Sequence, residues 1–199
     1  MSIGKGVEPL KGHADSSYVH LRARDESGFG MLELLMAMVM LNVGILAIVA
    51  AFSSGNGALS RANQISTAAA LADKQMEVYR GLKNDNIFFT TSEWNAAIAD
   101  STYTADSVYQ QNMASPPAPK RLVGTQTNCA ASVPTTACDP SYTATGADHR
   151  SYRVDTYLYY DTPSFGNELK TITVVIRDSA NLSKSLARVS STFDPATGQ

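Results

Sequence analysis

The sequence lacks the features by which several functional classes are recognised. Its 16 Lys and Arg stand against 18 Asp and Glu, so it has no excess of positive charge to drive binding to nucleic-acid phosphates. Its two cysteines and three histidines are too few and too scattered for a zinc site. It contains no Walker loop and no GxSxG or HExxH motif. We therefore expect no nucleic-acid partner, no cofactor, no metal site and no enzymatic activity.

Charged residues are also scarce, at 17% of the chain, and they are nearly absent between Phe29 and Phe52. The only strongly polar side chains in this stretch are Glu33 and Asn42. As a helix it would be about 36 Å long, enough to cross a hydrocarbon core of about 30 Å. We therefore predict a transmembrane helix over residues 29–52.

Two other interpretations of this stretch stay open. One is a helix buried in a soluble core, although core helices are rarely apolar on every face over this length. The other is a cleaved signal peptide, whose apolar region should span only about 7–15 residues. The sequence Val49-Ala50-Ala51 resembles a weak cleavage site, which keeps this second alternative.

The charges on either side of the span predict its orientation. Residues 1–28 form a polar leader that carries Lys5, Lys11, Arg22 and Arg24, whereas only Arg61 follows closely after the span. By the positive-inside rule the N-terminus should be cytoplasmic, and everything after Phe52 should lie outside the cytoplasm. We expect a single-pass membrane protein.

Residues 53–83 are predicted to continue the helix with an amphipathic face. Gly55 and Gly57 weaken any continuous helix at that point, and Gly81 marks its end. Beyond the two glycines, apolar residues recur at spacings of four and three, as expected for a core-facing stripe. The stripe consists of Ile65, Ala69, Ala72, Met76 and Tyr79.

Residues 84–199 are expected to form a globular domain. Trp94 is a candidate anchor beside a short helix at Ala96–Ile98, and residues 125–148 look like a long variable loop. Alternating apolar residues predict strands over 152–160, 169–177 and 186–193, with 121–124 as a candidate fourth. Short turns between consecutive strands imply an antiparallel sheet, and the helical stripe is the natural cover for its inner face. The predicted fold class is α+β, with a long N-terminal helix packed on a small C-terminal antiparallel sheet.

Two further groups of residues in the loops have alternative interpretations. Cys129 and Cys138, about nine residues apart, should form a disulfide outside the cytoplasm and restrain their loop by about 2–3 kcal/mol; two free thiols are the alternative. Without EF-hand spacing, the loop carboxylates are expected to be solvated rather than to bind calcium. These carboxylates are Asp100, Asp106, Asp139, Asp148 and Asp161.

The junction between leader and span has a distinctive pattern. It reads Ser27-Gly28-Phe29-Gly30-Met31-Leu32-Glu33, so that a polar leader ends in Gly, an aromatic residue follows, and Glu stands fifth after that Gly. With the unbroken apolar stretch that comes next, this combination resembles the type IV prepilin signature. The resemblance covers residues 1–80 closely and the remainder only in architecture.

The resemblance implies roles for three residues. A prepilin peptidase would cut between Gly28 and Phe29 and methylate the new Phe29 amine. Glu33 would pair with the Phe29 amine of a neighbouring subunit during assembly. Independently of the family, a carboxylate at the centre of a span costs about 2.5–3.5 kcal/mol, less near an end, so Glu33 should have a partner. The alternative is that Glu33 extends to the lipid headgroups.

The chain departs from the commonest family pattern at several positions. Gly30 and Met31 stand where many members have Thr or Ser and then Leu, the leader is long, and Ala50 replaces a frequent proline. Residues 31–44 and 72–77 look more like the V-type minor pilins and the I-type minor pseudopilins of type II secretion. The resemblance therefore favours a minor subunit over the bulk fibre subunit.

The predicted function is that of a structural subunit of a type IV pilus or related filament, cleaved after Gly28 and assembled through its apolar helix. The implied partners are a prepilin peptidase, other pilin subunits, the inner-membrane assembly machinery and the membrane. After processing the protein would lie in a surface filament or in the periplasm. The alternatives are a type II secretion or competence pseudopilin and, from another class, a signal-anchored extracytoplasmic binding domain.

Overall fold

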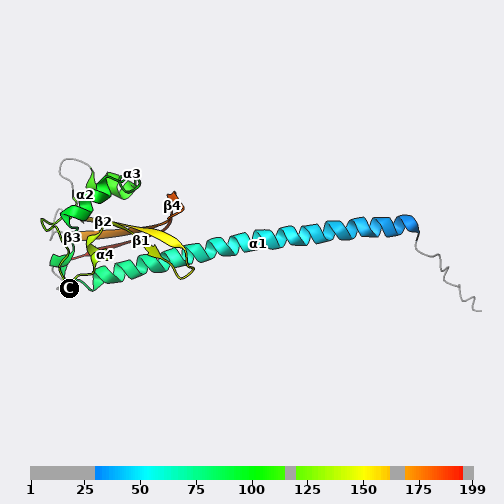
Figure 1. Ribbon diagram of the computed structural model, residues 1–199, viewed down its shortest axis with the longest axis horizontal. Helices are drawn as coiled ribbons and strands as arrows, with labels where there is room; N and C mark the ends of the chain where they lie inside the picture. The colour runs from blue at the N-terminus through cyan, green and yellow to red at the C-terminus, as the bar shows by residue number, and fades with distance from the viewer. Residues whose placement is uncertain (1–29, 115–119, 162–168, 195–199) are drawn as a thin grey trace, which may run out of the picture. The chain divides into compact units, whose positions relative to one another are not determined.

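The computed structural model describes residues 30–114, 120–161 and 169–194 (Figure 1). The leader and the predicted processing residues Gly28 and Phe29 lie outside the described residues. The fold class is confirmed, since a long N-terminal apolar helix packs on a four-stranded antiparallel sheet. The elements are α1 (Met31–Arg80), η1 (Asn84–Asn86), α2 (Thr91–Ile98), α3 (Ser101–Thr104), η2 (Tyr109–Met113), α4 (Thr135–Cys138), β1 (Ser141–Thr145), β2 (Ser151–Asp161), β3 (Leu169–Asp178) and β4 (Asn181–Phe193).

Helix α1 is continuous over its 50 residues. It passes without a break through Gly55 and Gly57, and it ends at Arg80, directly before Gly81 as predicted. The chain divides into two compact units, Met1–Ala50 and Ala51–Gln199. In the first unit, every described residue is exposed, and α1 is long and apolar enough to cross a membrane. In the second unit, the rest of α1 belongs to the globular domain.

The buried stripe of α1 differs from the predicted one. Ala72, Met76 and Tyr79 are buried as expected, but Ile65 is 46% exposed. The prediction was wrong at Ile65 because full burial of the helix begins only at Ala68. The stripe also includes the polar Gln75. Its amide is satisfied, since Nε2 donates to the Thr136 carbonyl at 2.8 Å and Oε1 accepts from the Tyr142 hydroxyl at 2.8 Å.

The four strands lie in sequence order, with every neighbouring pair antiparallel. The predicted fourth strand at 121–124 was wrong, because this segment makes only two isolated bridges, from Arg121 to Tyr159 and from Val123 to Phe89. The fourth strand is instead β1, which pairs with β2 from Ser151 to Asp155. The segment 125–148 is therefore more than the loop that its composition suggested, because it contains α4 and β1.

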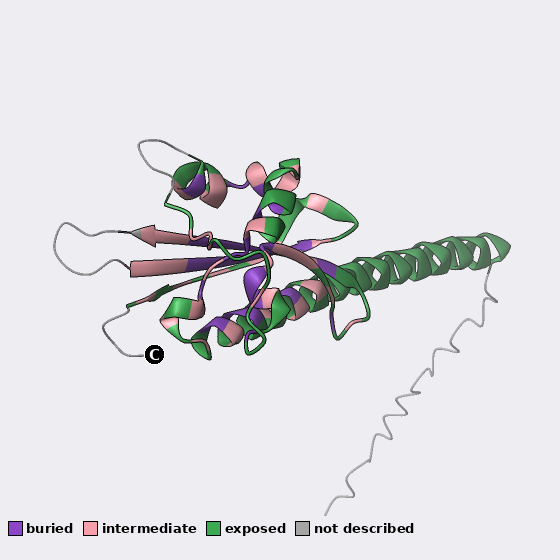
Figure 2. Ribbon diagram, turned by 60° about the vertical axis from the view of Figure 1, so that its left-hand side comes forward, coloured by how far each residue is buried: buried purple, intermediate pink, exposed green. Residues whose placement is uncertain are grey.

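Both faces of the sheet are covered, whereas a single cover was predicted. Helix α1 lies on one side of the sheet, and α2 and α3 lie on the other (Figures 1 and 2). Val154, Leu158 and Ile176 are buried in one row of the sheet, and Tyr157 and Val175 are buried in the row that points the other way. Tyr157 packs on the Tyr103 ring of α3, so its row belongs to the face that α2 and α3 cover. The domain core is thus a sheet between two helical layers.

Trp94 anchors the second layer, as predicted. It is 4% exposed, and its ring stacks on Phe89 and Tyr109 with centroids 6.2 and 6.1 Å apart. Tyr103 stacks on Tyr157 of β2 with centroids 4.6 Å apart, which joins this layer to the sheet. The predicted short helix is α2, and the Thr90 hydroxyl caps it by accepting from the Glu93 amide.

Candidate functional site

The first half of α1 presents an apolar surface on every side. Within the described residues of the first unit, no residue of α1 is buried, and large side chains such as Met31 (84%) and Met40 (73%) are widely exposed. A helix that is apolar all round is stable in lipid or among other helices, because neither environment leaves apolar surface in water. This surface is the candidate membrane and assembly site.

Glu33 is the acidic residue in the first turn of this surface. Its backbone amide donates to the Gly30 carbonyl at 2.8 Å, so its position on the helix is fixed by the opening turn. In the described part of the chain, its side chain makes no ion pair. The other two residues that sequence reasoning assigned to processing and assembly, Gly28 and Phe29, precede the described residues. A carboxylate without an ion-pair partner on an apolar helix is a group that can select a cation on another chain.

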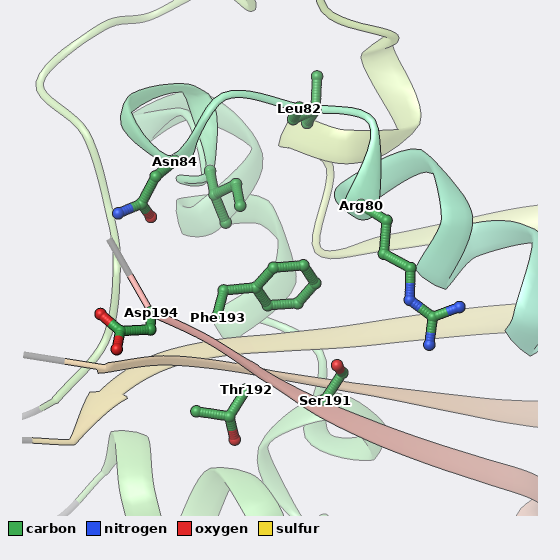
Figure 3. A pocket seen from close by; sticks show the side chains of 8 residues that line it. Arg80, Leu82, Asn84, Ser191, Thr192, Phe193 and Asp194 are labelled. Carbon is green, nitrogen blue, oxygen red and sulfur yellow. The ribbon is translucent and has the colours of Figure 1, made fainter. Parts of the chain in front are cut away.

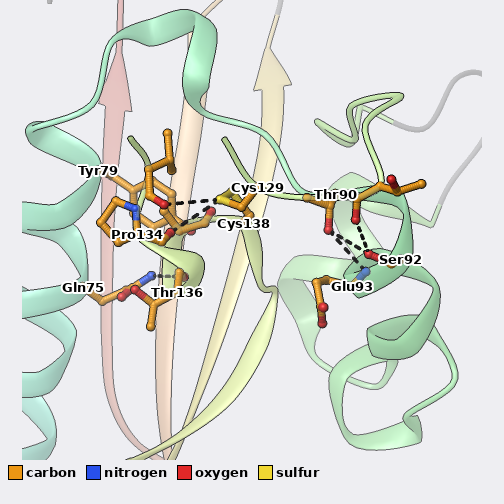
Figure 4. The surroundings of a disulfide bond; sticks show 12 residues. Gln75, Tyr79, Thr90, Ser92, Glu93, Cys129, Pro134, Thr136 and Cys138 are labelled. Carbon is orange, nitrogen blue, oxygen red and sulfur yellow. Dashed lines mark hydrogen bonds between the residues drawn. A yellow bond between two sulfur atoms is a disulfide. The ribbon is translucent and has the colours of Figure 1, made fainter. Parts of the chain in front are cut away.

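The disulfide between Cys129 and Cys138 is confirmed, with Cα atoms 5.9 Å apart. The loop that it closes is docked on the end of α1, as Figure 4 shows around Gln75 and Tyr79. The Tyr79 hydroxyl donates to the Ala137 carbonyl at 3.0 Å, and burial raises the pKa of Tyr79. The Thr90 amide donates to the Cys138 carbonyl at 3.3 Å. The disulfide loop therefore holds the end of α1 and the start of α2 together.

A buried ionic network joins the sheet to the second helical layer, and sequence reasoning missed it. At its centre, the fully buried Asp155 accepts from the Arg153 Nε at 2.7 Å, from the Ser141 hydroxyl at 2.7 Å and from the Arg177 Nε at 3.1 Å. Arg153 and Arg177 face each other across β2 and β3. Two like charges in directly opposed positions need carboxylates around them, which explains the acidic residues nearby.

Asp106 and Asp100 complete this network. Asp106 is 6% exposed and accepts from Arg177 and from both terminal nitrogens of Arg188, at 3.1 and 2.9 Å. Asp100 accepts from Arg153 and also caps α3. Burial opposes ionisation of Asp106, but the hydrogen bond from Arg188 and the two arginine charges outweigh it and lower its pKa. The expectation of solvated loop charges was therefore wrong for these two residues, because α3 and η2 turn them towards the arginines of the sheet.

Two further loop carboxylates are also engaged in local hydrogen bonds. Asp139 accepts from the Ser141 amide at 2.9 Å, and burial together with the charge of Glu93 raises its pKa. Asp148 accepts from the Tyr152 hydroxyl at 2.5 Å, and this hydrogen bond is the main reason that its pKa is lowered. Asp139 and Asp148 therefore organise local turns. The side chain of Asp161 lies outside the described part of the chain.

One pocket of the domain lies at the end of the sheet where α1 stops. It has a volume of about 330 Å³ between the end of α1 and the end of β4, and Figure 3 shows Arg80 and Phe193 among its lining side chains. Its other lining residues are Leu82, Asn84, Ile87, Ser191, Thr192 and Asp194. Across the described ranges, no three His, Cys, Asp or Glu side chains are grouped so that they could hold a metal ion.

No protein-family model, no curated protein and no solved structure matches this chain. The function must therefore be inferred from the chain's own residues, above all from those of α1.

Proposed function

We propose that the protein is a structural subunit of a type IV pilus or related filament, most simply a minor pilin, cleaved after Gly28 and assembled through its apolar helix. One observation carries the proposal. Helix α1 is continuous, yet its first half is exposed and apolar with one carboxylate, while its second half packs into a globular domain. A membrane anchor alone needs the apolar stretch but does not need Glu33 near its start.

The apolar half of α1 would lie in lipid before assembly and among other helices afterwards. Both environments shield its apolar side chains from water, so association with other helices depends on packing and on polar contacts such as those of Glu33. A carboxylate near the start of the span then favours a position where a cation lies within reach. Cleavage before Phe29 creates such a cation, and an amine and a carboxylate offset along two helices fix the stagger between subunits.

Processing and assembly of the subunit require other proteins. A prepilin peptidase removes the leader on the cytoplasmic side, the inner-membrane assembly machinery supplies the energy, and other pilin subunits cover the apolar surface. The sequence contains no nucleotide-binding motif, so energy must come from other proteins. The N-terminus is cytoplasmic before processing, and the globular domain lies outside the cytoplasm.

A pseudopilin of type II secretion or competence is the second candidate, favoured by the character of residues 31–44. It has the same processing and helix packing, but its filament does not extend from the cell surface. Recovery of the processed chain in sheared surface filaments therefore separates a pilin from a pseudopilin.

Three variants test the proposal in cells that express the peptidase and the assembly machinery. Gly28→Val enlarges the residue before the cut and should leave the chain unprocessed. Glu33→Gln removes the charge but keeps the size, so the chain should be processed and then fail to enter filaments. Asn42→Leu is the matched control, because it removes the other strongly polar side chain of the span without removing a charge. It should be processed and assembled.

The same variants also test the alternative of a signal-anchored binding domain. If Gly28→Val and Glu33→Gln leave processing, export and filament content unchanged, the protein is a signal-anchored binding domain rather than a filament subunit.

A further inference from the structure

Two hairpin ends of the globular domain lie against the same stretch of α1, Ser60–Ile65. From the β1–β2 connection, the Arg150 Nη2 lies 3.5 Å from the Ser60 hydroxyl. From the β3–β4 hairpin, Asp178 and Lys184 line a pocket of about 180 Å³ together with Arg61 of α1. All of these residues belong to the second compact unit, so their arrangement is that of one body.

The cations at this end of the domain face solvent. Arg61 and Lys184 are exposed, and the Arg150 side chain is 50% exposed, with its Nε 3.9 Å from Asp148. The two acidic residues beside these cations, Asp148 and Asp178, are half-buried, and each accepts a hydrogen bond within its own hairpin. Asp148 accepts from the Tyr152 hydroxyl, and Asp178 accepts from the Ala180 amide at 2.9 Å. We define Arg61, Arg150 and Lys184 as the basic collar.

The basic collar stands close to the end of the predicted span. Arg61 follows Phe52 by nine positions of continuous helix, which corresponds to a rise of about 14 Å. The headgroup region extends about 5–8 Å beyond the hydrocarbon core on each side. Side chains of a helix lean towards its N-terminus, so the long Arg61 side chain leans back towards the span. The distance that remains between the Arg61 charge and the headgroups is within the Debye length of about 8 Å, so the two can attract each other.

We propose that the basic collar binds the headgroups of anionic phospholipids and holds the globular domain at the membrane surface before assembly. The three cations come from α1, from the β1–β2 connection and from β4, and all three side chains are exposed, which suits a charged surface rather than a single enclosed phosphate. This inference rests on the membrane-anchoring part of the proposed function, and it does not depend on filament assembly. Its consequence is a docked state that the subunit must leave on entering a filament.

The test uses the full chain in nanodiscs of phosphatidylcholine with or without phosphatidylglycerol. A fluorophore at Ser183, an exposed residue of β4 next to Lys184, reports proximity through quenching by lipids spin-labelled at the headgroup. Phosphatidylglycerol should increase the quenching, and salt should reverse the increase. Near an anionic surface each Lys or Arg favours the docked form by about fivefold. Arg61→Gln/Lys184→Gln should therefore lower the ratio of docked to undocked protein by roughly 25-fold.

The matched control is Lys74→Gln/Lys83→Gln, which removes two exposed charges further along the chain, from Lys74 in the second half of α1 and from Lys83 just beyond it. It should keep the response to phosphatidylglycerol. Equal quenching in both lipids, or an equal loss in the control, would overturn the collar while leaving the anchor intact. Extraction of the wild-type chain from membranes by alkaline carbonate would overturn the anchor and the collar together.

Discussion

Replacing Asp155 by asparagine removes the charge at the centre of the buried ionic network. The carboxylate is fully buried and accepts hydrogen bonds from Arg153, Arg177 and Ser141 at 2.7–3.1 Å. Asparagine keeps the shape but directs an NH₂ group at an arginine donor. Removing one partner of a buried ion pair costs about 3–5 kcal/mol. Because Arg153 keeps Asp100 and Arg177 keeps Asp106, we expect a loss near the lower end, about 3 kcal/mol.

The assay is denaturant unfolding of the full chain in detergent, followed by the fluorescence of Trp94. This is the only tryptophan, and it is 4% exposed in the layer that the network attaches to the sheet. Asp73→Asn on the exposed side of α1 is the control, and it should change the free energy of unfolding by no more than about 0.5 kcal/mol. A loss below about 1 kcal/mol for Asp155→Asn would contradict a stabilising role of the network, because the network would then contribute no more than an exposed ion pair.

Three further predictions concern the same domain. Replacing Cys129 and Cys138 by alanine should lower the free energy of unfolding by about 2–3 kcal/mol, since the closed loop is short; equal stability of the reduced and oxidised chains would contradict this. Gly146→Ala should cost about 1–3 kcal/mol, because its Cβ would lie 2.5 Å from Thr67 and 2.7 Å from Tyr152. The control Gly57→Ala, whose Cβ would meet nothing within 4 Å, should instead stabilise the helix, and thermal unfolding distinguishes the two. The pKa values of Asp100 and Asp106 are lowered by folding, so their contribution to stability is present above about pH 4 and is lost as the pH falls through the lower folded values. Folding raises the pKa of Asp139, so its ionised form makes the folded protein less stable at neutral pH. Asp139→Asn should therefore not destabilise the protein at neutral pH. Denaturant midpoints measured from acid to neutral pH test both predictions.

The elements with a strong local pattern were predictable. Helix α1 and strands β2 and β3 follow from apolar residues at helical or alternating spacing. Strand β4 begins at Asn181 rather than at the predicted Leu186. The register shifts near Arg177, which faces Ser185 while Ile176 faces Ala187, so Leu186 is out of step with the alternation. The sequence of β4 alone cannot reveal this bulge, because the bulge arises from the pairing of β4 with β3.

Features that depend on tertiary contacts were not predictable in this way. Strand β1, Ser141–Thr145, turns only Tyr142 and Ala144 towards the core, which is too short a row to predict a strand, and its pairing depends on the free edge of β2. Arg153 and Asp155 alternate with apolar residues, as on a solvent-exposed face. They are buried because α3 and η2 cover that face with acids far away in the sequence. The one signal in the sequence was Tyr157, an aromatic residue in the same row as the two charges.

The parts of the candidate site also differ in how far the sequence predicts them. The junction around Gly28, Phe29 and Glu33 could be proposed from the sequence alone, because the resemblance to the prepilin signature depends on the order of neighbouring residues. The structure adds that the helix after Glu33 is continuous and fully exposed through its apolar half. The basic collar could not be found in the sequence, since its three cations come together only when two hairpins pack on α1.

The mass of the N-terminal peptide in filaments sheared from cells shows whether the protein is a processed filament subunit. A filament subunit should yield a peptide that begins at Phe29 and carries one additional methyl group, which would establish processing and incorporation together. A chain that begins at Met1 and stays in the membrane fraction would contradict the proposed function and leave an anchored binding domain.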